Sequence, residues 1–374
     1  MMSAIAPILL TAGGTGGHMF PAEALAAALL KRGRRVMLVT DKRGQGFGDR
    51  LPEVETRRIA AGALAGKRLA DRLSGLMRLA QGYFEARKIV RAARPALAVG
   101  FGGYASVPAM LAASHARVPL LLHEQNAVMG RANRLLAGRA QRIATCFEQV
   151  GALSAAGRKH AVLTGNPVRP AIAALSHSTY VAPAPGGVLE LLVIGGSQGA
   201  RILSQVIPAA LEKLGAPERA RLRLAQQCRA EDLDAVAATY RKLGFAAELK
   251  PFFADMPARL ARVHLMIARS GASTVAELQA AGRPAILVPY RFAADDHQTA
   301  NARAMAEAGA AWVMTESEFT PEALAQRLTA LLVHPEQLAA AAAASRRLAH
   351  VDAAERLADL AESLAPQSAG KEAA

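Results

Sequence analysis

The amino-acid sequence predicts an α/β fold of two domains, each a parallel β-sheet flanked by helices. Short apolar runs, glycine-bearing turns and amphipathic stretches alternate along the chain, which is the pattern of βαβ units. A length of 374 residues exceeds what one hydrophobic core usually supports, so two domains are expected. The apolar run and glycine turn at residues 9–17 are repeated at 193–200, which indicates that the two halves share one architecture.

The first domain is expected to span residues 1–165. Strands are predicted where short apolar runs end in polar or glycine-bearing turns, and a helix over residues 22–32 follows the first of them. The predicted strands of this half are 8–10, 36–39, 96–99, 120–122 and 142–144.

Turn-forming residues separate the two halves. A break that starts at Gly165 predicts a linker over 166–186, followed by a second domain over 187–345. The alanine-rich stretch 339–365 predicts a terminal helix, and we expect residues 346–374 to be a C-terminal helix and tail able to pack back on the first domain. The predicted strands of the second half are 191–194, 222–226, 247–250, 265–268 and 285–288.

The formal net charge of +15 lies entirely in the first half of the chain. Residues 1–165 contain 24 Lys and Arg against 9 Asp and Glu, and the remaining 21 basic and 21 acidic residues cancel. This asymmetry favours an anionic partner, either nucleic acid or an anionic membrane surface, with a solvated basic face as the alternative. An aromatic fraction of 4% and the lack of a recognised nucleic-acid motif argue against nucleic acid.

Composition and cysteine usage indicate a globular protein of a reducing compartment. Hydrophobic residues make up 52% and charged residues 20%, which excludes a disordered or collagen-like chain. Cys146 and Cys228 have no metal-type spacing. The first apolar run stops at residues 11–14 without a basic leader, and no apolar stretch approaches the roughly 20 residues of a membrane span. We therefore expect a cytoplasmic protein without a signal peptide or transmembrane helix.

Two glycine turns follow predicted strands, at residues 13–17 and 195–199. Backbone N–H groups and the positive end of the next helix commonly hold phosphate at such turns, so two turns suggest two ends of one cleft. Neither turn matches G-x-x-x-x-G-K-[ST], and Met19 occupies the place of the third glycine of G-x-G-x-x-G. A tight turn without ligand is the alternative. His18 closes the first turn, where its imidazole could accept a proton from an attacking hydroxyl or cap the helix.

Polar clusters follow two further strands of the first half, at residues 100–106 and 123–126. Ligands bind at the carboxyl ends of the strands in open α/β sheets, so we expect both clusters and His18 to converge on one rim. Hydrogen-bonded scaffold is the alternative role for His123 and Glu124.

In the second half, residues 269–277 again run from a predicted strand into a helix, with small residues at the turn. Glu277 lies one helical turn inside, where its carboxylate could accept two ribose hydroxyls. Residues 288–301 supply amide and imidazole donors suited to a sugar. Asp295 and Asp296 form an isolated acidic pair, for which a solvated turn is at least as good an interpretation as a metal site.

In combination these motifs resemble the MurG family of glycosyltransferases over nearly the whole chain. That resemblance implies two Rossmann-like domains facing a central cleft, the GT-B fold. It also implies transfer of N-acetylglucosamine from UDP-N-acetylglucosamine to undecaprenyl-pyrophosphoryl-N-acetylmuramyl-pentapeptide, in peptidoglycan synthesis. Six motifs in order are far more specific than any one of them. They are residues 13–21, 102–104, 123–127, 165–169, 195–200, and 269–272 with Glu277.

The resemblance implies roles for individual positions. His18 would be the candidate general base, Glu277 would bind the ribose, and the backbone at Phe253 would read uracil. The acceptor side would contain Gly103, Tyr104, His123 and Glu124. UDP-sugar binding is implied for Thr15, Gly16, Gly17, Asn126, Arg169, Ser197, Phe253, Ala272, Ser273, Thr274, Glu277 and Gln298.

The resemblance further implies an inverting displacement that gives a β-1,4 linkage without metal or cofactor, at the cytoplasmic face of the bacterial inner membrane. Two positions depart from the family pattern. Met129 stands where many members have proline, and His297 stands where some have a second glutamine. Both departures bear on how the sugar hydroxyls are contacted.

A membrane-bound acceptor would give the basic half a role. Residues 67–91 place an apolar stripe on one helical face with basic residues around it, which fits interfacial binding to anionic lipid. The alternative is a core-facing helix with a solvated basic side. The apolar residues are Leu69, Leu73, Leu76, Ala80 and Tyr83 with Met77 and Phe84 adjacent, and the basic ones are Lys67, Arg68, Arg72 and Arg78.

Other functions remain open at this point. A GT-B relative with another acceptor or a UDP-N-acetylglucosamine epimerase would share the donor-binding loops. A nonenzymatic nucleic-acid-binding protein is a remote alternative.

Overall fold

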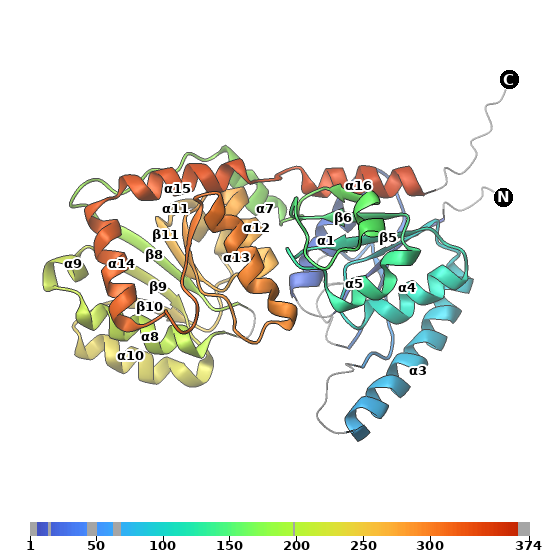
Figure 1. The fold of residues 1–374 in the computed structure, drawn as a ribbon, viewed down its shortest axis with the longest axis horizontal. Helices are drawn as coiled ribbons and strands as arrows, with labels where there is room; N and C mark the ends of the chain where they lie inside the picture. Colours follow the sequence, from blue (N-terminus) through green and yellow to red (C-terminus); the bar gives the residue numbers. More distant parts are fainter. Residues whose placement is uncertain (1–5, 14–15, 43–50, 63–68, 197–198, 366–374) are drawn as a thin grey trace. The chain divides into compact units, whose positions relative to one another are not determined.

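The structure, a computed structural model, describes residues 6–13, 16–42, 51–62, 69–196 and 199–365, with only the backbone of residues 69–72 (Figure 1). The chain forms two compact units, one made of residues 1–169 with 352–374 and the other of residues 170–351. Each unit is a parallel sheet covered by helices, which confirms the predicted α/β class.

The described part of the first unit contains a seven-stranded sheet in the order β3-β2-β1-β4-β5-β6-β7, with every neighbouring pair parallel. The strand order reverses at β1, between β2 and β4, which makes this the switch point where open α/β sheets bind ligands. The strands are β1 Ile8–Thr11, β2 Val36–Thr40, β3 Glu55–Arg58, β4 Leu97–Gly100, β5 Leu120–Glu124, β6 Arg142–Thr145 and β7 Ala161–Leu163. The helices are α1 Gly16–Lys31, α3 Leu69–Ala93, α4 Ser106–His115, α5 Arg131–Leu136, η1 Ala137–Arg139, α6 Ala155–Lys159 and α16 Ala353–Leu364.

The second unit repeats this plan with six parallel strands among its described residues, in the order β10-β9-β8-β11-β12-β13. Its switch point lies at β8, between β9 and β11. The strands are β8 Leu189–Ile194, β9 Leu222–Gln227, β10 Ala247–Lys250, β11 Leu265–Ala268, β12 Ala285–Leu287 and β13 Ala311–Val313. The helices are α7 Pro170–Ala173, η2 Ala174–His177, α8 Arg201–Lys213, α9 Ala216–Ala220, η3 Ala230–Asp232, α10 Leu233–Lys242, α11 Met256–Arg262, α12 Ala272–Ala281, η4 Ala294–Asp296, α13 His297–Glu307, α14 Pro321–Val333 and α15 Glu336–Arg347.

Every predicted strand is present within two residues of its predicted ends. Sequence reasoning missed β3, β7 and β13, which are three of the four outermost strands of the two sheets. Each of the three has only three or four residues and is partly solvated, so none has the longer apolar run that marks a buried central strand. The sequence of β3, Glu-Thr-Arg-Arg, is the extreme case, because its side chains are mostly exposed.

Two helix predictions need correction. The helix predicted over residues 22–32 begins at Gly16, so it includes the end of the first glycine turn and His18. The single helix predicted over 339–365 is wrong, because residues 348–352 interrupt it between α15 and α16. Alanine and leucine also occur within the break, so helical spacing in the sequence does not reveal it.

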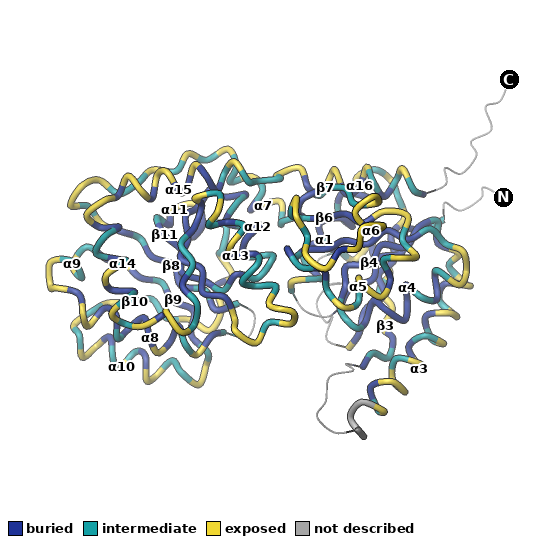
Figure 2. Tube along the Cα trace, in the orientation of Figure 1, coloured by how far each residue is buried: buried dark blue, intermediate teal, exposed yellow. Residues whose placement is uncertain are grey.

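The core of the first unit has a layer on each face of its sheet. Ile8 and Leu10 pack on the side of α1, and Leu9 packs on the side of α4. Figure 2 shows the strands as largely buried and the outer face of α3 as largely exposed. None of the helices in the described ranges is both long and apolar enough to cross a membrane.

The last helix, α16, packs on α1 of the first unit. Leu357, Ala358 and Ala361 are buried in the core layer that contains α1. Arg32, at the end of α1, donates to Asp359 at 2.6 Å and to Glu362 at 2.9 Å, and also pairs with Glu355. The chain therefore starts in the first unit, forms the second, and returns to the first.

Residues 170–177, inside the segment expected to be a linker, form α7 and η2 and pack on α12 of the second unit. Arg346 donates to the carbonyl oxygens of Ser176 and Ser178. This part of the connection is therefore bound to the second unit.

Candidate active site

Two glycine turns of the first unit meet at the carboxyl edge of its sheet. The Gly13 N–H donates to Gly102 O over 3.2 Å and joins the turn after β1 to the turn after β4. Gly102 and Gly103 have φ of 83° and 78°, in the left-handed region that favours glycine. A Cβ on Gly103 would lie 3.1 Å from Gly13 Cα, so the close approach of the two turns depends on the missing side chains.

His18 lies in the first turn of α1 and packs against this junction. A Cβ on Gly103 would lie 3.3 Å from His18 Cδ2, and a Cβ on Gly102 would lie 3.5 Å from His18 Cε1. The imidazole is half-buried at the rim. The structure therefore brings His18 and the Gly103 turn together, as the strand order predicts.

The remaining residues of the first glycine turn differ in their exposure. Gly16 is half-buried and Gly17 is exposed at the start of α1, while Thr15 lies outside the described residues. On the neighbouring turns, Tyr104 and Asn126 are half-buried.

His123 is fully buried near the end of β5. Its Nδ1 lies 3.0 Å from Gln125 Nε2, which can only donate, so Nε2 of His123 carries the proton and donates to Gly165 O at 3.2 Å. Burial lowers the pKa of His123 to about 4, the hydrogen bond to Gly165 opposes this shift, and the nearby His18 adds a smaller lowering effect. The side chain is thus a neutral link between β5 and the turn after β7, without a surface for a ligand.

Glu124 is also buried, and its carboxylate organises the following loop. It accepts hydrogen bonds from the backbone N–H of Asn126 at 3.0 Å and of Gly130 at 2.9 Å, and from Asn133 Nδ2 at 2.8 Å. Burial raises the pKa of Glu124, and these donors oppose that rise. With 1% of its surface exposed, Glu124 acts on the loop that carries Asn126.

Asn133 was not predicted as a site residue, because it lies inside α5 and belongs to no motif. Its amide connects Glu124 to His123 O, and it borders the Gly102 turn. The burial of this asparagine indicates its structural role, and sequence spacing alone does not reveal that burial.

Arg169 and Met129, two further positions singled out in the sequence, both pack within the first unit. The Arg169 guanidinium carbon lies 5.3 Å from the centre of the Phe20 ring, so Arg169 stacks over α1. Met129 is buried in the core layer of α4, so this departure from the family pattern faces the interior of the unit.

The second glycine turn follows β8, at the switch point of the second sheet. Gly196 and Gly199 have φ of 85° and 68°. A Cβ on Gly195 would lie 2.5 Å from Ala200 N, so a side chain there would displace the start of α8. Ser197 lies outside the described residues.

The helix α12 begins beside this turn, after the neighbouring strand β11. Gly271 is its N-cap and supplies no side-chain cap, and its first turn contains no acidic residue. The positive end of the ten-residue helix is therefore formed by backbone N–H groups at Ala272, Ser273 and Thr274, all half-buried. Glu277 is half-buried one turn further along.

Gln298 is held next to the start of α12. Its Oε1 accepts from the Tyr290 N–H at 3.0 Å, and its carbonyl accepts from Ser270 Oγ at 2.8 Å. Asn301 Nδ2 donates to Ser270 O at 3.0 Å and completes the link between α13 and β11. His297 turns back to Ala294 O, at 2.7 Å from its Nδ1.

Phe253 follows β10 at the same edge of the sheet. Its ring is buried under the Arg259 guanidinium, which lies 3.9 Å from the ring centre. Arg259 is fixed in turn by Glu248 through two contacts of 2.7 Å and by Asp255 at 2.8 Å. The Phe253 side chain thus anchors its segment, and its backbone remains the part suited to recognise a ligand.

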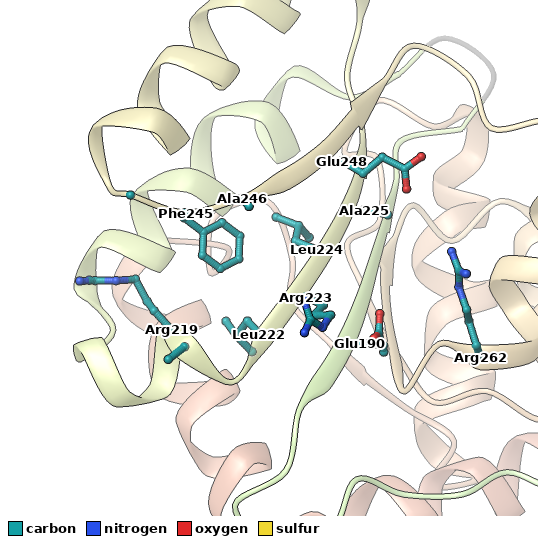
Figure 3. Close-up of a pocket in the computed structure, with 12 residues that line it drawn as sticks. Glu190, Arg219, Leu222, Arg223, Leu224, Ala225, Phe245, Ala246, Glu248 and Arg262 are labelled. Atoms are coloured by element: carbon teal, nitrogen blue, oxygen red, sulfur yellow. The ribbon is translucent and has the colours of Figure 1, made fainter.

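A separate pocket of about 400 Å³ lies at the other end of the second sheet (Figure 3). Its lining includes Leu222 and Leu224 of β9, Phe245 before β10, and the cross-strand neighbours Glu190 and Arg223. It contains none of the predicted site residues.

The isolated acidic pair forms an exposed turn. Asp295 and Asp296 have φ of 53° and 52°, lie in η4 and directly precede α13. Over the ranges that the structure describes, no three His, Cys, Asp or Glu side chains are grouped so as to hold a metal ion.

Comparison with known proteins relates both units to one group of enzymes. Residues 8–145 match the glycosyltransferase family 28 N-terminal domain, and residues 190–357 match the glycosyltransferase family 28 C-terminal domain. A relative from Rhodospirillum centenum is 57% identical over 95% of this chain and 93% of its own length. One from Paramagnetospirillum magneticum is 55% identical over 97% of this chain and 98% of its own length.

Both relatives are named UDP-N-acetylglucosamine–N-acetylmuramyl-(pentapeptide) pyrophosphoryl-undecaprenol N-acetylglucosamine transferase. Among solved structures, the crystal structure of Acinetobacter baumannii MurG matches with a TM-score of 0.76 and 30% identity, over 96% of this chain and 99% of that one.

Proposed function

Because this chain belongs to glycosyltransferase family 28 and, within it, to the MurG family, we propose that it transfers N-acetylglucosamine from UDP-N-acetylglucosamine to undecaprenyl-pyrophosphoryl-N-acetylmuramyl-pentapeptide. The product is the disaccharide-bearing lipid of peptidoglycan synthesis. The observation that carries the proposal is the packing of His18 on the junction of two glycine turns, at the carboxyl edge of a Rossmann-like sheet.

The second unit supplies the main grip on the donor nucleotide. The helix α12 offers its positive end and its backbone N–H groups to the diphosphate at residues 272–274. Glu277 accepts the ribose hydroxyls, and the backbone at Phe253 recognises uracil. Ser197 contributes from the neighbouring turn, and Gln298 contacts the sugar.

The first unit supplies the acceptor side and the base. His18 takes the proton from the attacking hydroxyl of the muramyl sugar as its oxygen bonds to the anomeric carbon of N-acetylglucosamine. The bond from that carbon to the diphosphate oxygen breaks on the opposite side, so the configuration inverts and UDP leaves. Gly103 and Tyr104 border the acceptor, and Thr15, Gly16, Gly17 and Asn126 contact the sugar or diphosphate.

The departing diphosphate gains negative charge, which fixed dipoles and one cation can stabilise. The α12 N-terminus provides the dipole and Arg169 provides the cation. These groups supply the electrostatic stabilisation that a metal ion provides in other transferases, so neither metal nor cofactor takes part in the proposed mechanism.

His123 and Glu124 support this reaction from beneath the rim. Both are buried and hydrogen-bonded within the first unit, so they position the loops that carry Asn126 and Gly165. This support role replaces direct contact with the acceptor in the proposed mechanism.

The helix α3 gives the first unit a surface for the membrane that contains the acceptor. Its core-facing side is made of Gly75, Gly82, Ala86 and Val90. A Cβ on Gly82 would collide with Ala60 O, so the helix packs closely through its small residues. The stripe expected from the sequence therefore lies on another side of the helix.

That stripe is exposed over most of its described length, which favours interfacial binding over a core-facing helix. Leu73, Leu76, Met77 and Phe84 are each more than half exposed. Tyr83 is the exception, because it is half-buried and bonded to His115. Exposed basic residues on α3 suit anionic lipid headgroups, and they are Arg78, Arg87, Lys88 and Arg91. Lys67 and Arg68 lie outside the described residues, as do the side chains of Leu69 and Arg72.

The test is release of UDP from UDP-N-acetylglucosamine by the purified protein, with and without a polyprenyl-pyrophosphoryl-muramyl acceptor. We expect release only when this acceptor is present. Turnover without it, or epimerisation of the donor sugar, would favour the epimerase alternative. Turnover only with a different acceptor would favour another GT-B transferase. A protein that binds nucleic acid and leaves the donor intact would contradict the enzymatic proposal altogether.

A further inference from the structure

We propose that Gln227 sets the nucleotide selectivity of the donor site by fixing the distance between the second glycine turn and the segment that recognises the base. The inference rests on the proposed function, which places the diphosphate at the start of α12, beside the second glycine turn, and uracil at the backbone of Phe253. Gln227 itself lies below both and is a positioning residue.

The side-chain amide of Gln227 bonds to both segments. It lies at the end of β9, between the turn after β8 and the segment after β10. Its Oε1 accepts from the Gly195 N–H at 3.1 Å. Its Nε2 donates to Gly196 O at 3.2 Å and to Pro251 O at 3.1 Å.

These three bonds determine the orientation of the amide and require glutamine. The amide nitrogen has two hydrogens, and each is used on a carbonyl oxygen, while the amide oxygen meets an N–H. The flipped amide would place its oxygen against two carbonyl oxygens. A glutamate would do the same, and an asparagine is one methylene too short to reach both segments from the same backbone position.

The base-recognising segment is held at its other end by Arg259. The Phe253 ring packs under that guanidinium, and Asp255 pairs with it. Gln227 fixes the start of the segment at Pro251 and fixes the glycine turn at Gly195 and Gly196. The spacing between the glycine turn and the base-recognising segment is therefore set by one side chain that is itself 8% exposed.

The chain provides a matched control on the same strand. Gln226 precedes Gln227, so its side chain points to the opposite face of the sheet. It is fully buried and contacts the Tyr240 hydroxyl at 2.5 Å in the layer of α10. A change at Gln226 therefore removes a buried amide from β9 but leaves the glycine turn and the base-recognising segment bound to Gln227.

The experiment compares Gln227→Leu and Gln227→Asn with Gln226→Leu in the full-length protein. Inhibition constants for UDP and ADP are measured in the transfer assay, together with KM and kcat for UDP-N-acetylglucosamine and the thermal midpoint. We expect both Gln227 variants to raise KM and the UDP inhibition constant by about tenfold, because the glycine turn and the base-recognising segment are no longer held at a fixed spacing. The inhibition constant for ADP should change by less than about threefold, because the segment that recognises uracil contributes little to the binding of adenine. With saturating donor, kcat should stay within about twofold of wild type.

The Gln226→Leu variant should lower the thermal midpoint and leave the ratio of the two inhibition constants at its wild-type value. A ratio that is unchanged in both Gln227 variants would overturn the inference, as would an equal change in the Gln226 variant. If Gln227→Leu fails to fold, Gln227→Asn and the stability data still decide between selectivity and scaffold. A wild-type protein without preference for UDP over ADP would contradict both the proposed donor site and the inference. A preference for UDP that is unchanged in the Gln227 variants would contradict the inference alone.

Discussion

The position of His18 predicts a separation between chemistry and nucleotide binding. Its imidazole packs on Gly102 and Gly103 in the first unit, whereas the proposed nucleotide grip lies in the second. His18→Ala should therefore lower kcat by about 10² to 10⁴, the usual contribution of a general base, and leave the UDP inhibition constant within about twofold. Glu277→Gln is the matched control, and it should mainly raise the UDP constant. Equal losses of turnover and UDP binding in the His18 variant would assign His18 to the scaffold.

His123 predicts a dependence of stability on pH. Burial depresses its pKa from 6.5 to about 4, so between these values the unfolded chain binds a proton that the folded chain does not. The free energy of unfolding should fall as pH drops from about 6.5 to 4, by up to about 3 kcal/mol, and this contribution should be constant above 7. Denaturant unfolding of wild type and His123→Gln from pH 4 to 8 isolates the histidine, because the raised pKa of Glu124 acts in both. Parallel pH profiles would show that His123 does not titrate in this window.

At the residue scale, sequence reasoning could find which positions gather at the rim but not which of them face it. His123 and Glu124 follow a buried strand and read as site residues, yet both side chains turn inward to satisfy backbone groups. Consecutive strand residues alternate between two faces, and the loop geometry after β5 decides which side a polar group takes. Asn133 and Gln227 were missed because neither belongs to a motif. Their roles come from hydrogen bonds to groups on other elements, which sequence spacing does not reveal.

At the element scale, buried central strands and the turns that follow them are predictable, because continuous apolar runs and glycines are local signals. The edge strands β3, β7 and β13 are defined by pairing to a neighbour and have no comparable signal. The helix α3 shows the same limit. Its apolar stripe was predicted, but the close contact at Gly82 that turns the stripe outward depends on tertiary packing.

The exposed stripe of α3 predicts selective loss of membrane binding. Replacing Leu76, Met77 and Phe84 together by serine removes apolar surface that each side chain could bury in the lipid interface, worth about 1 to 2 kcal/mol apiece. Sedimentation with anionic vesicles should fall by more than about tenfold, and the thermal midpoint should change little because these side chains are exposed. Wild-type binding should weaken with added salt.

Val333→Ser is the control for this experiment, because Val333 is an equally exposed apolar residue in the second unit. It should leave sedimentation unchanged. Strong destabilisation of the triple variant would instead indicate that the stripe faces protein, and salt-independent binding would exclude the basic residues from the interaction.

At the scale of the whole molecule, the chain path ties the first unit to both ends of the sequence. The helix α16 completes a core layer with α1, and its charged side surrounds Arg32 with three carboxylates. Those carboxylates raise the pKa of Arg32 and keep it charged. The partly exposed ion pairs contribute little individually, so the buried leucine of α16 should dominate its attachment.

Leu357→Ala and Leu328→Ala therefore test whether the first unit supplies the acceptor side and the base while the second unit binds the nucleotide. Both leucines are fully buried, Leu357 in the first unit and Leu328 in the second, and each truncation should cost about 2 to 5 kcal/mol in its own unit. Hydrogen exchange should show loosening confined to the unit that carries the change. Leu357→Ala should reduce transfer while UDP still binds with near wild-type affinity, whereas Leu328→Ala should weaken UDP binding itself. If Leu357→Ala impaired UDP binding as much as Leu328→Ala, the nucleotide grip could not belong to the second unit, and the proposed roles of the two units would have to be revised.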